Sequence, residues 1–279
     1  MYRKTALLLL IILIISTLTL SGCTEPTAAQ SKSIDPNNTF IVLLEMNDFP
    51  DGYLDLPVDF INSEQLKTLF SDLGVPEENM LIKLDEMSSK DLADSFAWLE
   101  LTAPENATVF FYIAAHGAYI RDALAWHWNG PKRWNSLPQE QKILIIDSCH
   151  SGEFISSFEN EPNSGITYAI ASADEVQWWG VEEEGLPIIG SIWVHYFIEG
   201  ISNPESDINL DGNISFLEAA GYAASMFQTY MVEEVFAVEE FLERFERLYG
   251  YDSSKNMPYP NPVFNDHLDK DIILKVLDQ

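Results

Sequence analysis

Two stretches decide the fold: Phe110-Phe111-Tyr112-Ile113-Ala114-Ala115-His116-Gly117 and Ile143-Leu144-Ile145-Ile146-Asp147-Ser148-Cys149-His150-Ser151-Gly152. Each is a continuous apolar run that leads into reactive side chains and then a glycine. Such runs are typical of central strands buried on both faces of a parallel sheet. Open α/β sheets place their sites at the carboxyl ends of strands. We therefore expect His116 and Cys149 to meet at one edge of a sheet.

The segments around these stretches alternate between strand-like and helix-like patterns, which is typical of an α/β domain. Apolar runs predict further strands at 40–45, 80–84 and 167–171. Apolar residues at helical spacing predict helices at 63–73, 88–101, 191–201 and 216–248. Residues 119–140, aromatic and proline-containing, are predicted to form a long loop.

A cysteine and a histidine at one sheet edge can form a catalytic dyad. A thiol at its free pKa of about 8.5 is mostly protonated at neutral pH, and a nearby imidazole stabilises the thiolate and later protonates the leaving amine. Gly117 and Gly152 allow backbone amides to approach a substrate oxyanion. The pattern indicates acyl transfer with Cys149 as nucleophile and His116 as base; a buried inert cysteine beside a core histidine is the structural alternative.

The His-Gly and Asp-Ser-Cys-His-Ser-Gly blocks resemble the caspase-like cysteine peptidases, the superfamily of caspases, metacaspases and legumains. The resemblance implies an α/β fold, a caspase-like three-layer α/β/α sandwich with a mostly parallel central sheet. It also implies that the backbone amides of Gly117 and Cys149 form the oxyanion hole. The spacing from His116 to Cys149 is shorter than in typical caspases, so a catalytically inactive relative stays an alternative.

The resemblance also suggests substrate-binding residues. In metacaspase-like relatives the acid matching Asp147 favours Arg or Lys before the scissile bond, whereas legumain-like relatives cleave after Asn. An acid that only bonds to backbone amides is the other interpretation of Asp147. Ser172, Asp174 and Glu175 are weaker pocket candidates.

A second motif, at 207–218, fits the twelve-residue EF-hand calcium loop. Gly212 allows the sharp turn, and Glu218 closes the loop with two oxygens. The predicted ligands of one Ca²⁺, most simply a structural ion, are Asp207, Asn209, Asp211, Asn213, Ser215 and Glu218. An Asx-rich turn before a helix is the alternative interpretation.

The N-terminal sequence predicts that the protein is exported across the cell membrane. Two basic residues precede an apolar run at 6–20 that is shorter than a membrane-spanning helix needs. Leu20-Ser21-Gly22-Cys23 resembles the lipobox of prokaryotic lipoproteins, which implies lipid on Cys23 and a location on the outer face of the cell membrane. With Cys23 lipidated, Cys149 has no disulfide partner within the chain, since the sequence has two cysteines.

These patterns divide the chain into four predicted parts: a lipoprotein signal peptide at 1–22, a flexible tether at 23–38, a catalytic domain at 39–205, and a calcium loop with a helical C-terminal extension packed on that domain at 206–279.

The net charge of the chain limits the kinds of partner that are expected. The formal net charge is −29, from 15 basic and 44 acidic residues. Nucleic acid is not an expected partner, because phosphate binding needs a basic surface. The expected partners are a polypeptide substrate and, through the lipid anchor, a membrane. Two further functions stay open, a non-catalytic surface binding module and a transpeptidase that passes the acyl group to an amine, as does the oligomeric state.

Overall fold

The computed structural model places most of the chain after residue 31, and residues 31–279 form one compact unit. The residues that the structure describes are 32–56, 59–122, 126–139, 141–156, 166–171, 179–180, 185–249, 263–266 and 271–277.

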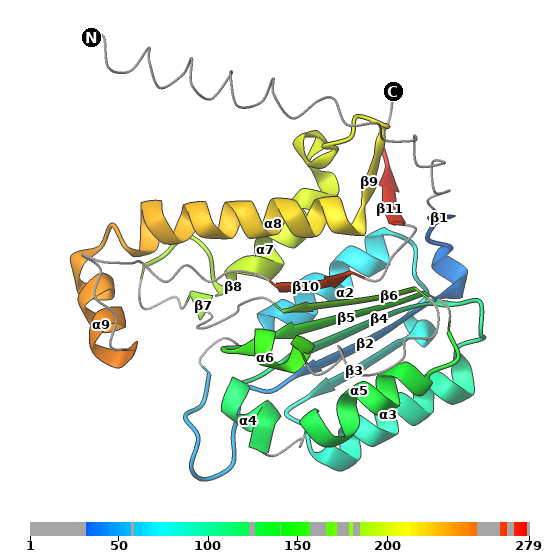
Figure 1. Ribbon diagram of the computed structural model, residues 1–279, viewed down its shortest axis with the longest axis horizontal. Coiled ribbons are helices and arrows are strands. Elements are labelled where there is room, and N and C mark those ends of the chain that lie inside the picture. Colours follow the sequence, from blue (N-terminus) through cyan, green and yellow to red (C-terminus); the bar gives the residue numbers. More distant parts are fainter. Residues whose placement is uncertain are drawn as a thin grey trace, which may run out of the picture. The chain divides into compact units, whose positions relative to one another are not determined.

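A six-stranded sheet forms the centre of the molecule (Figure 1). In spatial order its strands are β10 (Val263–Asp266), β6 (Ile166–Ala171), β5 (Gln141–Asp147), β4 (Thr108–Ala114), β2 (Thr39–Glu45) and β3 (Met80–Leu84). The five strands from β6 to β3 are parallel, and β10 adds an antiparallel edge. Every residue of β2, β4 and β5 is buried, as predicted from their continuous apolar sequences.

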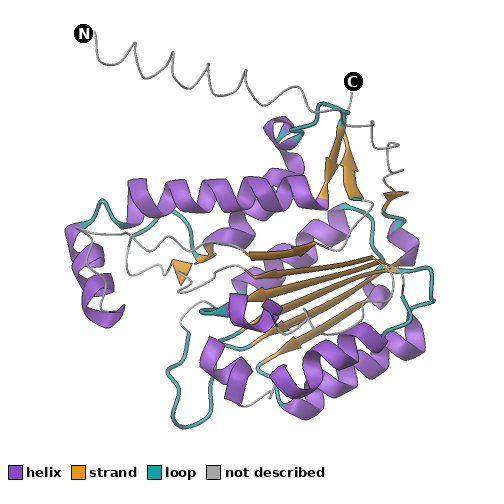
Figure 2. Ribbon diagram, viewed as in Figure 1, coloured by secondary structure: helices purple, strands orange, loops and turns teal. Residues whose placement is uncertain are grey.

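Helices cover both faces of this sheet, so the fold is a three-layer α/β/α sandwich (Figure 2). Phe110 and Tyr112 face one core, which α2 (Ile61–Asp72), α7 (Ile192–Ser202) and α8 (Phe216–Tyr230) enclose. Val109 and Phe111 face the other core. There α3 (Ser89–Thr102), α4 (Gly117–Asp122), α5 (Trp126–Ser136) and α6 (Ser151–Ser156) pack. The alternation follows from the two-residue period of a strand.

Capping residues fix where two of these helices begin. The Ser88 hydroxyl accepts from the Asp91 amide while the Asp91 carboxylate accepts from the Ser88 amide, so α3 starts with a capping box. Ser215 and Glu218 form the same reciprocal pair at the start of α8. Each box gives partners to backbone N–H groups that a helix leaves without one.

The loop predicted at 119–140 is wrong, because that segment forms most of α4 and all of the described α5. Pro131 lies inside α5 and hid the helix from the sequence pattern, since proline usually ends helices. The buried Trp134 holds α5 against the sheet through an edge contact with the ring of Phe111.

The C-terminal extension is only partly helical, which corrects the prediction for 206–279. After α8 come a π-helical turn, η5 (Met231–Val235), and α9 (Glu239–Tyr249), but β10 then extends the central sheet. Strand β11 (Ile272–Val276) pairs with β1 (Lys32–Ser33) and β9 (Asn213–Ser215) in a second sheet. A short ribbon of β7 (Trp179–Gly180) and β8 (Gly190–Ser191) precedes α7. Across the described ranges, no helix combines the length and apolar character needed to cross a bilayer.

Candidate active site

The register of β4 and β5 brings the two predicted dyad residues level with each other. Ala114 pairs with Asp147 at the ends of the two strands, and His116 and Cys149 each lie two residues beyond those ends. Gly117 comes so close to the second chain that a Cβ built on it would lie 2.0 Å from the carbonyl oxygen of Cys149. Only glycine permits this approach. The backbone beside the histidine and the backbone of the nucleophile candidate are therefore in direct contact.

The loop that follows β2 holds the imidazole of His116. Nε2 of His116 lies 2.8 Å from the carbonyl oxygen of Leu54. Because a carbonyl oxygen can only accept, Nε2 carries the hydrogen, and in the neutral ring Nδ1 is then the basic nitrogen. The ring of Phe49 packs against the imidazole at 4.8 Å between centroids. Neither contact was predicted from the sequence, because any residue can present a carbonyl and both contacts join residues far apart in the chain.

Cys149 lies between β5 and α6 and is half-buried. It packs at the margin of the core that α2, α7 and α8 enclose. The next residue, His150, has φ +57° in the left-handed region, so the chain turns sharply directly after the cysteine. Because of this turn, the backbone at His150 does not continue in the direction of β5.

Asp147 is fully buried, on the same face of β5 as Ile143 and Ile145. Its carboxylate accepts from the hydroxyl of Tyr112 at 2.8 Å and from the indole Nε1 of Trp179 at 3.4 Å. Burial first, and then the charge of Asp147, raise the pKa of Tyr112 well above its usual range, so the hydroxyl stays a donor. Asp147 is thus an oriented, buried carboxyl group two residues before the cysteine.

A second buried carboxylate, Glu45, was not anticipated from the sequence. Glu45 ends β2 in the same register row as Ala114 and Asp147. It accepts from Asn62 Nδ2 at 2.9 Å and from the Ser63 amide at 2.7 Å, which caps the start of α2. Burial raises the pKa of Glu45 to about 7, against the opposing hydrogen bonds, and nearby Asp147 adds to the rise. Two buried carboxyl groups therefore lie in one register row at this edge of the sheet, and burial favours the neutral form of Glu45.

Several predicted site residues lie outside the described residues. Ser172, Asp174 and Glu175 fall in the segment between β6 and β7, and Cys23 precedes residue 32. The pocket and lipidation roles assigned to them stay predictions.

The predicted calcium loop connects α7 to α8 by way of a short turn at Pro204–Ser206. Asp207 accepts from the amides of Asp211 and Gly212 at 3.1 and 2.9 Å, and Gly212 has φ +81° as the sharp turn requires. Glu218 reaches back to accept from the amide of Asn209 at 3.3 Å. Asn213 and Ser215 lie in β9, paired with β11. All six predicted ligands therefore belong to one closed loop.

The donor set of this loop fits calcium. Asp207 and Glu218 are both buried, and each accepts from backbone amides of the loop. A hard divalent cation would neutralise such buried carboxylates, and the oxygens of Asn209, Asp211, Asn213 and Ser215 complete an all-oxygen set. Among the described residues, no three His, Cys, Asp or Glu side chains make a metal cluster by themselves. The amide and hydroxyl oxygens would have to contribute, as they do in loops of this type.

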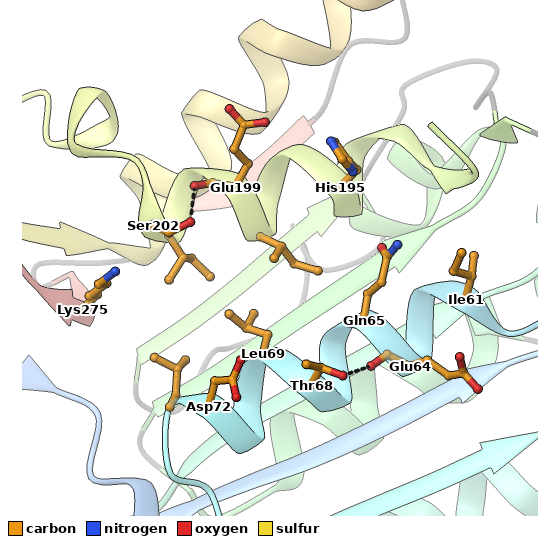
Figure 3. Close-up of a pocket in the computed structure, with 13 residues that line it drawn as sticks. Ile61, Glu64, Gln65, Thr68, Leu69, Asp72, His195, Glu199, Ser202 and Lys275 are labelled. Carbon is orange, nitrogen blue, oxygen red and sulfur yellow. Dashed lines mark hydrogen bonds between the residues drawn. The ribbon is translucent and has the colours of Figure 1, made fainter. Parts of the chain in front are cut away.

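A groove of about 860 Å³ lies between α2 and α7, away from the dyad (Figure 3). Gln65 and Leu69 contribute from α2, and His195 and Glu199 from α7. Neither His116 nor Cys149 lines this groove. It is therefore not the place where the predicted chemistry would occur.

Comparison with known proteins bears on the fold. No family model matches the sequence, and no curated protein matches it significantly. Among solved structures, the chain is similar to the crystal structure of caspase-1 from Spodoptera frugiperda, with a TM-score of 0.58. That match covers 93% of this chain and 99% of that chain at 10% sequence identity. The chain thus has a caspase-like fold, as predicted.

Proposed function

We propose that this chain is a cysteine endopeptidase that hydrolyses peptide bonds of extracytoplasmic proteins through a dyad of Cys149 and His116. The observation that carries the proposal is the close approach of Gly117 to the Cys149 carbonyl, in a register that sets His116 level with Cys149. This juxtaposition requires a glycine directly after the histidine. A merely structural histidine and cysteine have no such requirement.

Each group has one step in the proposed reaction. Nδ1 of His116 takes the thiol proton, since the Leu54 carbonyl holds Nε2 in its protonated form. The thiolate adds to the scissile carbonyl, and the amides of Gly117 and Cys149 stabilise the oxyanion. The imidazolium protonates the leaving amine, and water then hydrolyses the acyl-enzyme with His116 again as base.

Asp147 favours a cationic residue before the scissile bond. A buried carboxylate beside the nucleophile attracts a guanidinium or ammonium group strongly, because little solvent screens it. Tyr112 and Trp179 both donate to this carboxylate and help to orient it. We therefore place Arg or Lys first and Asn second as the residue preceding the cleaved bond.

A fluorogenic peptide library that varies the residue before the cleaved bond tests this function. Asp147→Asn keeps an acceptor for Tyr112 but removes the charge, so we expect kcat/KM for Arg peptides to fall about 10- to 100-fold, with smaller changes for Asn peptides. Equal losses for both peptide classes would refute a role of Asp147 in specificity.

A second experiment separates hydrolysis from transpeptidation. A peptide amine is added to the reaction, and mass spectrometry detects whether the products carry a free carboxylate or the added amine.

Anchoring through lipid on Cys23 places this activity at the outer face of the membrane. A single acyl chain binds a protein to a membrane only weakly, whereas two or more chains anchor it stably. We expect the protein expressed from its full sequence to partition into a detergent phase, and Cys23→Ser to move it to the aqueous phase. Partitioning that is unchanged in Cys23→Ser would rule out the anchor.

A further inference from the structure

The described part of the loop after β2, residues 46–56, folds back on itself at the sheet edge. The amide of Leu56 donates to the carbonyl of Asn47 at 2.8 Å, and the amide of Tyr53 donates to the carbonyl of Pro50 at 3.3 Å. Gly52 at the tip has φ +107°, a value that a residue with a side chain rarely adopts. The loop is therefore a defined structure whose tip is turned by a glycine.

Two residues of this loop contact His116, one from each side of the tip. Leu54 presents its carbonyl to Nε2, and Phe49 packs its ring on the imidazole. Leu54 as a whole residue is 83% exposed, so packing of its side chain does not hold its carbonyl in place. Another contact must set the position of this part of the backbone.

Asp55 provides that contact. Its Oδ1 accepts from the amide of Phe49 at 2.9 Å, and Asp55 follows Leu54 directly in the chain. One carboxylate therefore joins the backbone that carries the Phe49 ring to the backbone that carries the Leu54 carbonyl. Phe49 is itself buried and packs against Tyr119, so it serves as the fixed side of this link.

The base of the loop is anchored separately from Asp55. Asp85 accepts from the amides of Asn47 and Asp48 at 2.8 Å each, and the amide of Met46 donates to the carbonyl of Ala114. Loss of one part-buried hydrogen bond such as that between Asp55 and the Phe49 amide costs about 1 kcal/mol, a small part of the stability of a domain. Removal of the Asp55 carboxylate should therefore loosen the loop tip and leave the fold intact.

We propose that Asp55 is a positioning residue that closes the loop so that the Leu54 carbonyl holds His116 as its Nε2–H tautomer. This inference rests on the proposed function for its catalytic consequence, but the tautomer itself is independent of activity. With the tautomer fixed, Nδ1 is always the nitrogen that exchanges a proton with Cys149. With the loop tip loose, the neutral ring divides between two tautomers, and only one can act as the base.

Nitrogen NMR of ¹⁵N-histidine-labelled protein tests the inference, with His116→Gln to assign the signal. The variants are Asp55→Ala, which removes the acceptor, and Asp55→Asn, which keeps an oxygen for the Phe49 amide. Asp51→Ala removes an exposed carboxylate from the same loop and is the matched control. We expect wild type, Asp55→Asn and Asp51→Ala to show the Nε2–H tautomer, and Asp55→Ala to show both.

Peptide turnover supplies the second measurement. For Asp55→Ala we expect kcat to fall about 10- to 100-fold with KM changed less than about twofold, and Asp55→Asn to recover most of the loss. An unchanged tautomer in Asp55→Ala would overturn the inference whatever happens to kcat. If wild type cleaves no peptide, the proposed function fails while the tautomer measurement still decides the role of Asp55.

Discussion

Cys149→Ala and His116→Ala each lower kcat/KM for peptide hydrolysis by at least about 10³-fold, because the first removes the nucleophile and the second removes its base. Both variants should also lose rapid reaction with iodoacetamide near neutral pH: the first lacks the thiol, and in the second the thiol loses the imidazole that favours its ionisation. Turnover with a fluorogenic peptide and alkylation followed by mass spectrometry measure these losses. Both side chains sit at the sheet edge, so near-ultraviolet circular dichroism should stay native.

His150→Asn is the matched control for these two variants. His150 is the imidazole nearest to Cys149 in the chain, and asparagine tolerates the left-handed backbone at this position. Full activity in His150→Asn assigns the base to His116, whereas retained activity in His116→Ala would exclude the mechanism. Wild-type protein whose Cys149 alkylates no faster than an ordinary thiol would instead point to a non-catalytic binding module.

The sheet was predictable from sequence because its strands carry their own signal. The strand expected at 80–84 coincides with β3, and β2 and β6 each begin one residue before the strands expected at 40–45 and 167–171. The apolar residues 110–114 and 143–146 lie in β4 and β5. Continuous apolar runs can be satisfied only by burial on both faces, so local sequence determines them. The parallel register, which places His116 level with Cys149, follows once these strands are neighbours.

Features that depend on contacts distant in sequence could not be predicted. The Leu54 carbonyl reaches His116 across 62 residues, and a backbone carbonyl leaves no mark in a sequence. In the sequence, Glu45 resembles an ordinary acid at the end of a strand. Its hydrogen bonds with Asn62 and Ser63, at the start of α2, exist only in the folded structure. Strand β10 adds to the sheet after all the helices, although its sequence is short and polar at one end. Tertiary structure decides such elements, and a local pattern does not.

The predicted calcium loop depends on both local sequence and distant contacts. The spacing of its ligands is local, whereas its closure depends on β11. Leu277 donates from its amide to the carbonyl of Gly212, and Ile214 pairs with Lys275, so the C-terminal strand holds the second half of the loop. A cation bound here would join α7, α8 and β11. We therefore expect its effect to appear in the stability of the whole compact unit.

Calcium should raise the melting temperature of wild type by roughly 5 to 10 °C at a hundredfold excess over its Kd, which corresponds to about 2.7 kcal/mol. Glu218→Gln should remove most of this shift, because the loop loses its closing bidentate carboxylate while the amide oxygen still caps α8 at the Ser215 amide. Glu205→Gln removes an exposed acid just before the loop and should behave as wild type. Calorimetric titration and thermal unfolding with calcium, magnesium or a chelator measure the effect. A wild-type melting temperature that is the same in calcium and in chelator would leave the loop as an Asx-rich turn before α8.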